Sequence, residues 1–261
     1  LAHAGALYCL SWSADGKYIA CGDFTGGVHV SDVDRGIVVR STKYHTRPVL
    51  RVAFSPFDIK LLASCSLDRG GIAVWPVDAD AARMIEHATI CSGIAWSSLQ
   101  SGLLAATSDD GAVFVYQTDP RGGAPAKTVH KLVGHTARSF AVAFSPLVPH
   151  LLASTSNDRT VRIWDTREGR GSCVKVLQGH TDLSRPVLWH PELPSLLFSG
   201  SWDSTIRSWD VSSGLCLGIA MQHGADVYGL AIHPARPFLM ASASRDSTLQ
   251  LWSLSSGAGG G

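Results

Sequence analysis

Apolar residues alternate with polar or small residues in short runs along most of this chain. Such alternation over four to eight residues is typical of half-buried β-strands. One stretch contains four of these runs: FAVAFSP (140–146), LLASTS (151–156), TVRIWD (160–165) and SCVKVLQ (172–178). The second and third runs are separated only by Asn157 to Arg159, residue types that favour a tight hairpin. The stretch therefore predicts four consecutive antiparallel strands.

The same order of runs returns down the whole chain, and a histidine marks each return. These residues are His3, His45, His87, His135, His180 and His223, separated by 42, 42, 48, 45 and 43 residues. A period of this size indicates one supersecondary unit that is repeated. We expect one domain over 1–254 and a Gly-rich linker or tail over 255–261. The predicted repeats span about 3–44, 45–86, 87–134, 135–179, 180–222 and 223–254.

Four strands in a unit of this length are typical of a β-propeller blade. The units resemble WD repeats (WD40) in their Gly-His and Trp-Asp pairs. The residues that carry the resemblance are Gly134-His135, Gly179-His180, Trp164-Asp165 and Trp209-Asp210. The resemblance covers residues 3–252 and implies an all-β propeller with six blades.

The resemblance also implies a buried network in each blade. The turn Asp would hold the His, the His would reach a Ser or Thr on the second strand, and that hydroxyl would bond the indole N–H of the Trp. The predicted members are His45, Asp68 and Trp75; His135, Asp158 and Trp164; His180, Asp203 and Trp209; and His223, Asp246 and Trp252, with hydroxyls such as Ser154, Ser199 and Ser242. A catalytic Ser-His-Asp triad is needed once, in a cleft. We therefore interpret the recurring trio as structural and expect no enzyme and no cofactor.

The second and third repeats depart from this pattern. In the second, an extra residue at Gly70-Gly71 widens the turn, although the network is expected to be complete. In the third, Tyr116 occupies the Trp position beside His87 and Asp110.

The first repeat departs further, with Thr25 at the Asp position and Ser31 at the Trp position. We expect Trp12, Tyr18 and the strand over 28–33 to supply its packing, and this blade to be the most loosely specified. Aromatic residues recur on the first strand of each repeat and are expected to lie in the core between blades. These are Trp12, Phe54, Trp96, Phe144 and Trp189, with Ile232 in the sixth.

The sixth repeat has no run for an outer strand after Trp252. Propellers avoid exposed strand edges by closing the ring. We expect the chain to be part of a longer protein in which a seventh blade completes the ring. The alternative is a six-bladed ring in which only the missing strand lies outside this segment.

Composition narrows the functional classes. The net charge is +1, so no broad attraction to nucleic acid is expected, and no apolar run is long enough to span a membrane. Six scattered cysteines without a CxxC pair argue against a zinc site and are typical of reduced thiols in the cytoplasm. Charged residues make up 16%, below the roughly 25% of soluble domains.

Residues just before each turn Asp or shortly after each His are expected at the rim of one propeller face. If Trp202 is exposed among Arg side chains, the composition is that of a protein-binding hot spot. The alternative is that Trp202 packs on a neighbouring loop and the arginines are only solvated. The candidates are Trp202, Arg245, Tyr228, Asp226, Arg185, Arg138, Arg47 and Asn157. The insertion over 119–131 is predicted to be a flexible loop, with a contact arm as the functional alternative.

These features predict a protein–protein interaction scaffold within a multi-subunit assembly, without a small-molecule substrate. Residues 195–254 resemble scaffold proteins in which two propellers precede helical repeats, which implies a cytoplasmic and plausibly ciliary or flagellar (axonemal) setting. Vesicle-coat and intraflagellar-transport subunits have a similar layout. The alternative is a substrate receptor of a cullin-RING ubiquitin ligase, because Trp164 to Arg167 (WDTR) resembles the short box of such receptors.

Overall fold

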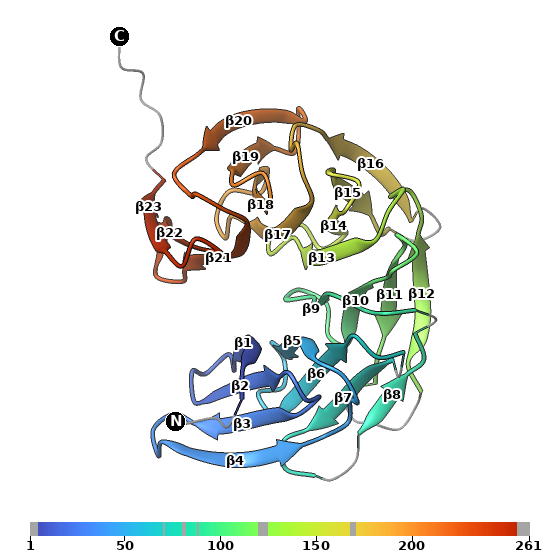
Figure 1. Cartoon of the computed structure of the whole chain (residues 1–261). Helices are drawn as coiled ribbons and strands as arrows, with labels where there is room; N and C mark the ends of the chain where they lie inside the picture. Colours follow the sequence, from blue (N-terminus) through green and yellow to red (C-terminus); the bar gives the residue numbers. More distant parts are fainter. Residues whose placement is uncertain are drawn as a thin grey trace.

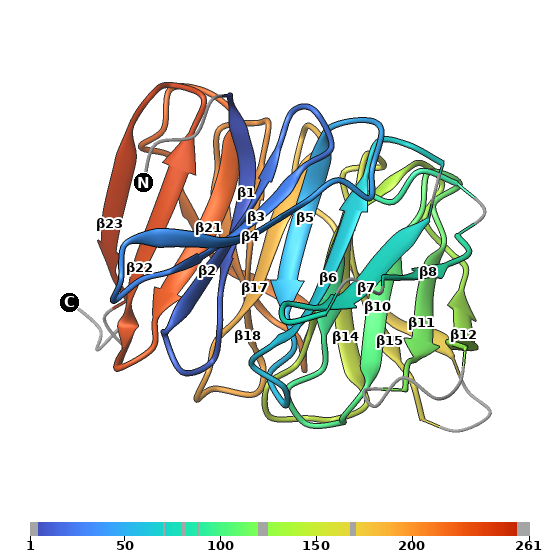
Figure 2. The same ribbon diagram turned by 90° about the horizontal axis from the view of Figure 1, so that it is seen from below.

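The structure is a computed structural model that describes residues 5–69, 71–79, 82–87, 89–119, 125–167 and 171–254. It contains six antiparallel sheets that follow one another around a central channel (Figure 1). Seen from the side, inner strands such as β5 and β21 run along the direction of the channel, whereas the outer strand β4 lies across it (Figure 2). The prediction of an all-β propeller with six blades encoded in this segment is confirmed, while the number of blades in the closed ring stays a prediction.

Each blade is a meander in which consecutive strands pair. The strands of blades one to three are β1 (Leu7–Trp12), β2 (Tyr18–Asp23), β3 (Val28–Asp32), β4 (Ile37–Thr42), β5 (Val49–Phe54), β6 (Leu61–Ser66), β7 (Ile72–Pro76), β8 (Arg83–Ile85), β9 (Ile94–Trp96), β10 (Leu103–Thr107), β11 (Val113–Gln117) and β12 (Lys127–Leu132). Those of blades four to six are β13 (Ser139–Phe144), β14 (Leu151–Ser156), β15 (Val161–Asp165), β16 (Ser172–Leu177), β17 (Ser184–Trp189), β18 (Leu196–Ser201), β19 (Ile206–Asp210), β20 (Leu215–Ala220), β21 (Val227–His233), β22 (Arg236–Ser244) and β23 (Leu249–Ser253). Five sheets have four strands, and the sixth, β21 to β23, has three, as its sequence predicts.

Burial along the strands explains their composition. The second strand of a blade has neighbours on both edges and both faces, so β6 and β10 are buried at every position. Small residues such as Ala63 and Ala105 let the adjacent blades approach closely there. Outer strands alternate instead, as β16 does, because one of their faces meets solvent.

The hydrophobic core lies between blades as five layers, one at each junction of successive blades. The inner-strand aromatics belong to these layers: Phe54, Trp96, Phe144 and Trp189 are each at most 8% exposed. Trp96 and Trp189 also donate their indole N–H across a junction to the carbonyls of Ala53 and Ala143, both at 3.1 Å.

The expectation that Trp12 packs blade one is wrong, because its side chain is 52% exposed. The corresponding Trp96 and Trp189 bond to the preceding blade, whereas among the described residues β1 and β21 are not packed as the other successive inner strands are. The partner face of blade six is open too, with Leu249 and Leu251 at 68% and 67% exposed. Tyr18 does pack against the core layer between blades one and two.

Candidate functional site

The predicted residues of blade four form a continuous hydrogen-bonded chain, which we call the clamp. His135 Nδ1 lies 2.8 Å from Asp158 Oδ2, and His135 Nε2 lies 2.8 Å from Ser154 Oγ. Trp164 donates its indole N–H to the same Ser154 oxygen at 2.7 Å. Ser154 and Trp164 are fully buried, so the clamp fixes the second and third strands of the blade to the loop that precedes its first strand.

Blades five and six have the same clamp. The structure joins His180 to Asp203 (2.9 Å) and Ser199 (2.8 Å), Trp209 to Ser199 (2.8 Å), His223 to Asp246 (3.0 Å) and Ser242 (2.6 Å), and Trp252 to Ser242 (2.7 Å). The geometry is that of an interior support, because each serine oxygen is already bonded to an imidazole and an indole.

A threonine two residues after each turn Asp completes the clamp, and the sequence reasoning missed it. The hydroxyls of Thr160, Thr205 and Thr248 donate to the Asp carboxylates at 2.7, 2.6 and 2.6 Å. The signal was present as a Ser-x-Asp-x-Thr pattern that occurs three times, beginning at residues 156, 201 and 244. Burial alone raises the pKa of Asp158, but the hydrogen bonds from His135 and Thr160 outweigh it and hold that pKa well below its usual range.

The expectation of a complete clamp in blade two is wrong. His45 Nε2 bonds Ser64 Oγ at 3.0 Å, but His45 Nδ1 is 3.4 Å from Asp68 Oδ2. The indole N–H of Trp75 is buried without a hydrogen-bond partner among the described residues. Two local differences from blade four accompany this change. The turn of blade two is one residue longer, and the residue before its histidine is Tyr44, where blade four has Gly134. The ring of Tyr44 lies 5.6 Å from that of Trp75.

Blade three uses a different partner for its histidine. The hydroxyl of Tyr116 lies 2.8 Å from His87 Nδ1, the position that an Asp holds in blade four, and His87 Nε2 lies 3.1 Å from the carbonyl oxygen of Thr107. Asp110 instead accepts a hydrogen bond from the backbone N–H of Ala112. Burial lowers the pKa of His87, and the carbonyl of Thr107 and the charge of Asp110 oppose this effect without cancelling it.

In blade one a different set of residues takes the place of the clamp. His3, the predicted histidine of this blade, lies outside the described residues. His29 Nε2 is 2.9 Å from Asp23 Oδ2, and His29 Nδ1 is 2.9 Å from Ser41 Oγ. Asp23 also accepts hydrogen bonds from Thr25 and from the backbone N–H of Gly27. Burial raises the pKa of Asp23, but these bonds, led by that of His29, lower it to about 2. Asp23 thus organises the turn where Thr25 stands at the usual Asp position.

Several candidate partner-binding residues meet at one end of the channel. The guanidinium carbon of Arg185 lies 3.9 Å from the ring centre of Phe140 and 4.4 Å from that of Trp202. The ring of Tyr228 packs edge-to-face on Trp202, with centroids 6.3 Å apart. We call Phe140, Arg185, Trp202, Tyr228, Asp226 and Arg245 the rim cluster.

The cluster has a charged margin. Arg245 pairs with Asp226 at 3.6 Å, and the hydroxyl of Tyr228 donates to the same carboxylate at 3.4 Å. The Arg245 side chain is 71% exposed, and Tyr228 is 43% exposed. Trp202 lies between the two alternatives of the sequence analysis: it is half-buried, and Arg185 covers its ring.

The other candidates lie farther around the rim. Arg138 bonds Ser92 at 2.9 Å and Asp109 at 3.1 Å, and its backbone carbonyl accepts the N–H of Asn157. Arg47 is exposed on blade two and is not part of the rim cluster. Sequence reasoning missed Phe140, although it stands five residues after His135, as Arg185 does after His180 and Tyr228 after His223. That shared offset was the available signal.

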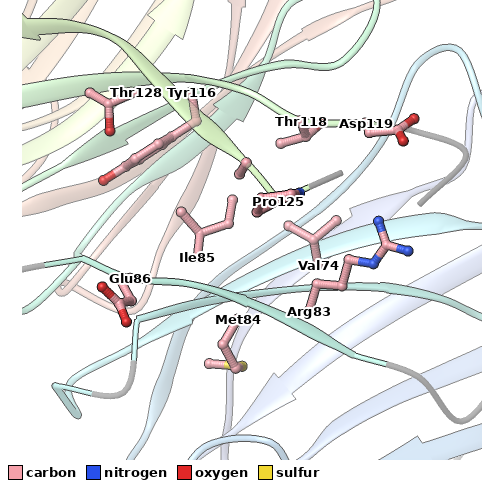
Figure 3. Close-up of a pocket in the computed structure, with 11 residues that line it drawn as sticks. Val74, Arg83, Met84, Ile85, Glu86, Tyr116, Thr118, Asp119, Pro125 and Thr128 are labelled. Carbon is pink, nitrogen blue, oxygen red and sulfur yellow. The ribbon is translucent and has the colours of Figure 1, made fainter. Parts of the chain in front are cut away.

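A cavity of about 700 Å³ lies on the outer side of the ring, between blades two and three (Figure 3). The short strand β8, with Arg83 to Glu86, forms one wall, and Tyr116, Thr118 and Thr128 line the other. The hydroxyl of Tyr116 is already bonded to His87. The insertion over 119–131 borders this cavity, and its residues 120–124 lie outside the described part of the chain.

Chemistry-bearing groups elsewhere are dispersed. All six cysteines are free, and burial raises the pKa of Cys9 to about 11. In the part of the chain that the structure describes, no three His, Cys, Asp or Glu side chains are grouped so that they could hold a metal ion. Across the same residues, no helix has the length and apolar character needed to cross a membrane.

Comparison with known proteins matches both a family model and a curated relative. The family model described as "WD domain, G-beta repeat" matches residues 1–32, 126–165, 171–210 and 214–253, more than half of the chain. The unmatched stretch between residues 32 and 126 contains blade two and the first three strands of blade three, where the clamp is altered. WD repeat-containing protein VIP3 from Arabidopsis thaliana is 40% identical over 55 residues, which cover 21% of this chain and 17% of that protein.

Proposed function

Because the chain belongs to the WD40 (WD domain, G-beta repeat) family of propellers, we propose that it is a non-catalytic scaffold that binds another protein through the rim cluster. WD40 propellers are generally protein-interaction platforms without catalytic activity. The observation that carries the choice of face is the contact of Arg185 with Phe140 and Trp202 beside the exposed Tyr228. Trp, Tyr and Arg are the residue types that dominate binding energy at protein interfaces.

The setting of this scaffold is a further part of the proposal. Residues 195–254 resemble the corresponding stretch of WD repeat-containing protein seventeen, a large protein with two propellers and helical repeats. This resemblance supports a subunit of a multi-protein assembly in the cytoplasm, at a cilium, flagellum or axoneme, or in transport. Under this proposal no nucleic acid, small-molecule substrate or membrane insertion takes part.

The test is affinity purification of the tagged protein from ciliated cells, followed by quantitative mass spectrometry. We expect Trp202→Ala and Arg245→Glu each to reduce recovery of the same partner at least fivefold. Phe57→Ala is the matched control, because Phe57 is an aromatic residue, 50% exposed, in the loop between β5 and β6 at the opposite end of the blades. Unchanged recovery of every partner with both rim variants would remove this face from consideration.

A ubiquitin-ligase receptor is the second candidate. Arg167, the last residue of its WDTR stretch, has a side chain that is 58% exposed, and its Nε is 2.9 Å from Asp165 Oδ2. Such an arginine remains accessible to an adaptor while its position is fixed. Recovery of a ligase adaptor that is lost with Arg167→Ala, but not with Trp202→Ala, would favour this function over the first.

A further inference from the structure

Arg185 is the only arginine of the rim cluster or its margin that lacks a polar partner among the described residues. It is 6% exposed, and its Nε is buried without a hydrogen bond. Arg138 and Arg245, by contrast, have carboxylate partners. An unpaired charge in a buried position is unfavourable by several kcal/mol in general, so its presence needs an explanation.

The surroundings of Arg185 do not supply a counter-ion. Burial is the main factor that lowers its pKa, and the positive charge of Arg138 adds to it, giving about 10, so the side chain remains protonated at neutral pH. Asp182 and Asp226 are near enough to act on its charge but make no ion pair with it. Asp226 is engaged by Arg245 and Tyr228, and Asp182 accepts the backbone N–H of Leu183.

The site has further unsatisfied groups and an opening. The indole N–H of Trp202 is also buried without a partner, as is the side-chain oxygen of Asn157 on the neighbouring turn. A cavity of about 270 Å³ on the channel side is lined by Pro186 and Val187, which follow Arg185 in sequence, and by Tyr228 of the rim cluster. The guanidinium of Arg185 and the indole N–H of Trp202, which stack on each other, are two donors that have no acceptor among the described residues.

We propose that Arg185 binds one carboxylate of a partner protein, an Asp or Glu side chain presented by an extended segment with an apolar neighbour. This inference rests on the proposed function of the rim cluster. A single negative charge fits, because Arg138 and Arg245 are already paired and only one cation lacks a partner. The apolar neighbour follows from Tyr228, which is 43% exposed and packs edge-to-face on Trp202 beside the guanidinium.

An aromatic cage for a cationic ligand is the opposite possibility, and the contacts disfavour it. The ring faces of Phe140 and Trp202 that would hold a cation are occupied by Arg185 itself. A second positive charge beside Arg185 would also be repelled.

The test starts from a phage-displayed library of random dodecapeptides selected on the full chain. Enriched peptides are synthesised with acetylated and amidated ends, and their affinities are measured by fluorescence polarisation. We expect a shared Asp or Glu whose replacement by Asn or Gln weakens binding at least tenfold. Arg185→Met should weaken binding of the original peptide by a similar factor. Combining Arg185→Met with the peptide that carries Asn or Gln should weaken binding little further.

Controls separate this inference from the proposed function. Arg185→Lys keeps the charge but not the planar guanidinium and should give an intermediate loss, while Phe57→Ala should leave the affinity unchanged. A peptide that binds better with a free C-terminus than with an amide would indicate a terminal carboxylate instead. Tighter binding of a phosphoserine peptide than of its Glu counterpart would indicate a phosphate. Either of these two results would overturn the assignment to a side-chain carboxylate.

The remaining outcomes divide as follows. Peptides that need Trp202 but contain no shared acidic residue would overturn the role of Arg185 and leave the rim cluster as the binding face. Peptides that are insensitive to every rim substitution, or no enrichment at all, would count against both proposals. Each variant is first checked for an unchanged circular dichroism spectrum and melting temperature.

Discussion

Blade four and blade two have the same four residue types at corresponding positions of the clamp, yet their hydrogen bonds differ. In blade four, Ser154 accepts the indole N–H of Trp164 and also bonds His135. In blade two, Ser64 bonds His45, but the indole N–H of Trp75 has no partner among the described residues. The comparison teaches that the same four residue types do not by themselves close the clamp, and that the open clamp of blade two accompanies a turn one residue longer and the Tyr44 ring beside Trp75.

The largest expected effect comes from removal of the shared hydroxyl. Ser154→Ala leaves two buried polar groups, the imidazole and the indole, without their partner and should lower the free energy of unfolding by about 3 kcal/mol. Ser64→Ala removes a single bond and should cost about 1 kcal/mol. Urea denaturation followed by circular dichroism measures both. Equal losses would mean that blade two is clamped as tightly as blade four.

A smaller effect separates the two tryptophans. Trp164→Phe removes ring area and a satisfied hydrogen bond, whereas Trp75→Phe removes similar area but relieves an unsatisfied indole N–H. We expect Trp164→Phe to be more destabilising by about 1–2 kcal/mol. Thermal unfolding of the two variants gives the comparison, and a greater loss for Trp75→Phe would contradict the geometry of blade two.

The smallest effect is a difference in pH response. Burial lowers the pKa of His87, and of His45 despite the opposing effect of Asp68. In the unfolded chain a histidine has a pKa of about 6.5, so these two imidazoles bind protons more readily in the unfolded than in the folded state. The free energy of unfolding therefore decreases as the pH falls below about 6.5. The depressed pKa of Asp158 acts only below the unfolded value of about 3.9. Hydrogen exchange at pH 7 and pH 5, corrected for intrinsic rates, should show greater opening of β10 and β11 than of β14 and β15.

The control for this response is His87→Gln, which removes the titrating ring. The difference in exchange of β10 and β11 between the two pH values should then shrink. A pH response that is equal in blades three and four, or unaffected by this substitution, would show that His87 is not its source.

The blades and the complete clamps could be predicted because both depend on residues within one repeat. Alternation sets the strands, and the fixed offsets of His135, Asp158 and Trp164 bring them together once the hairpin forms. The failures involve contacts between repeats or differences in backbone spacing. The exposure of Trp12 depends on a neighbouring blade, and the stacking of Arg185 on Phe140 joins residues 45 positions apart in sequence. No pattern within one repeat encodes those contacts.

In the third blade Tyr116, and not Asp110, bonds the histidine, and this contact could be predicted only in part. The sequence showed that the Trp position holds a Tyr, but not that its hydroxyl would bond His87. That role depends on the side-chain direction on β11, which brings the hydroxyl to the imidazole and leaves Asp110 with the turn backbone. The residue could be predicted as a departure, whereas its function in the clamp needed the structure.

The five core layers join six blades in a row, and this arrangement bears on how the molecule responds to force or heat. With β1 and β21 unpacked among the described residues, each blade is stabilised by its nearest neighbours only, as in a linear array of repeats. Unfolding of such an array begins at its ends, where a blade has a single neighbour, and proceeds inward one interface at a time. For this segment on its own, blades one and six would therefore melt first and leave the middle of the row as the last ordered unit.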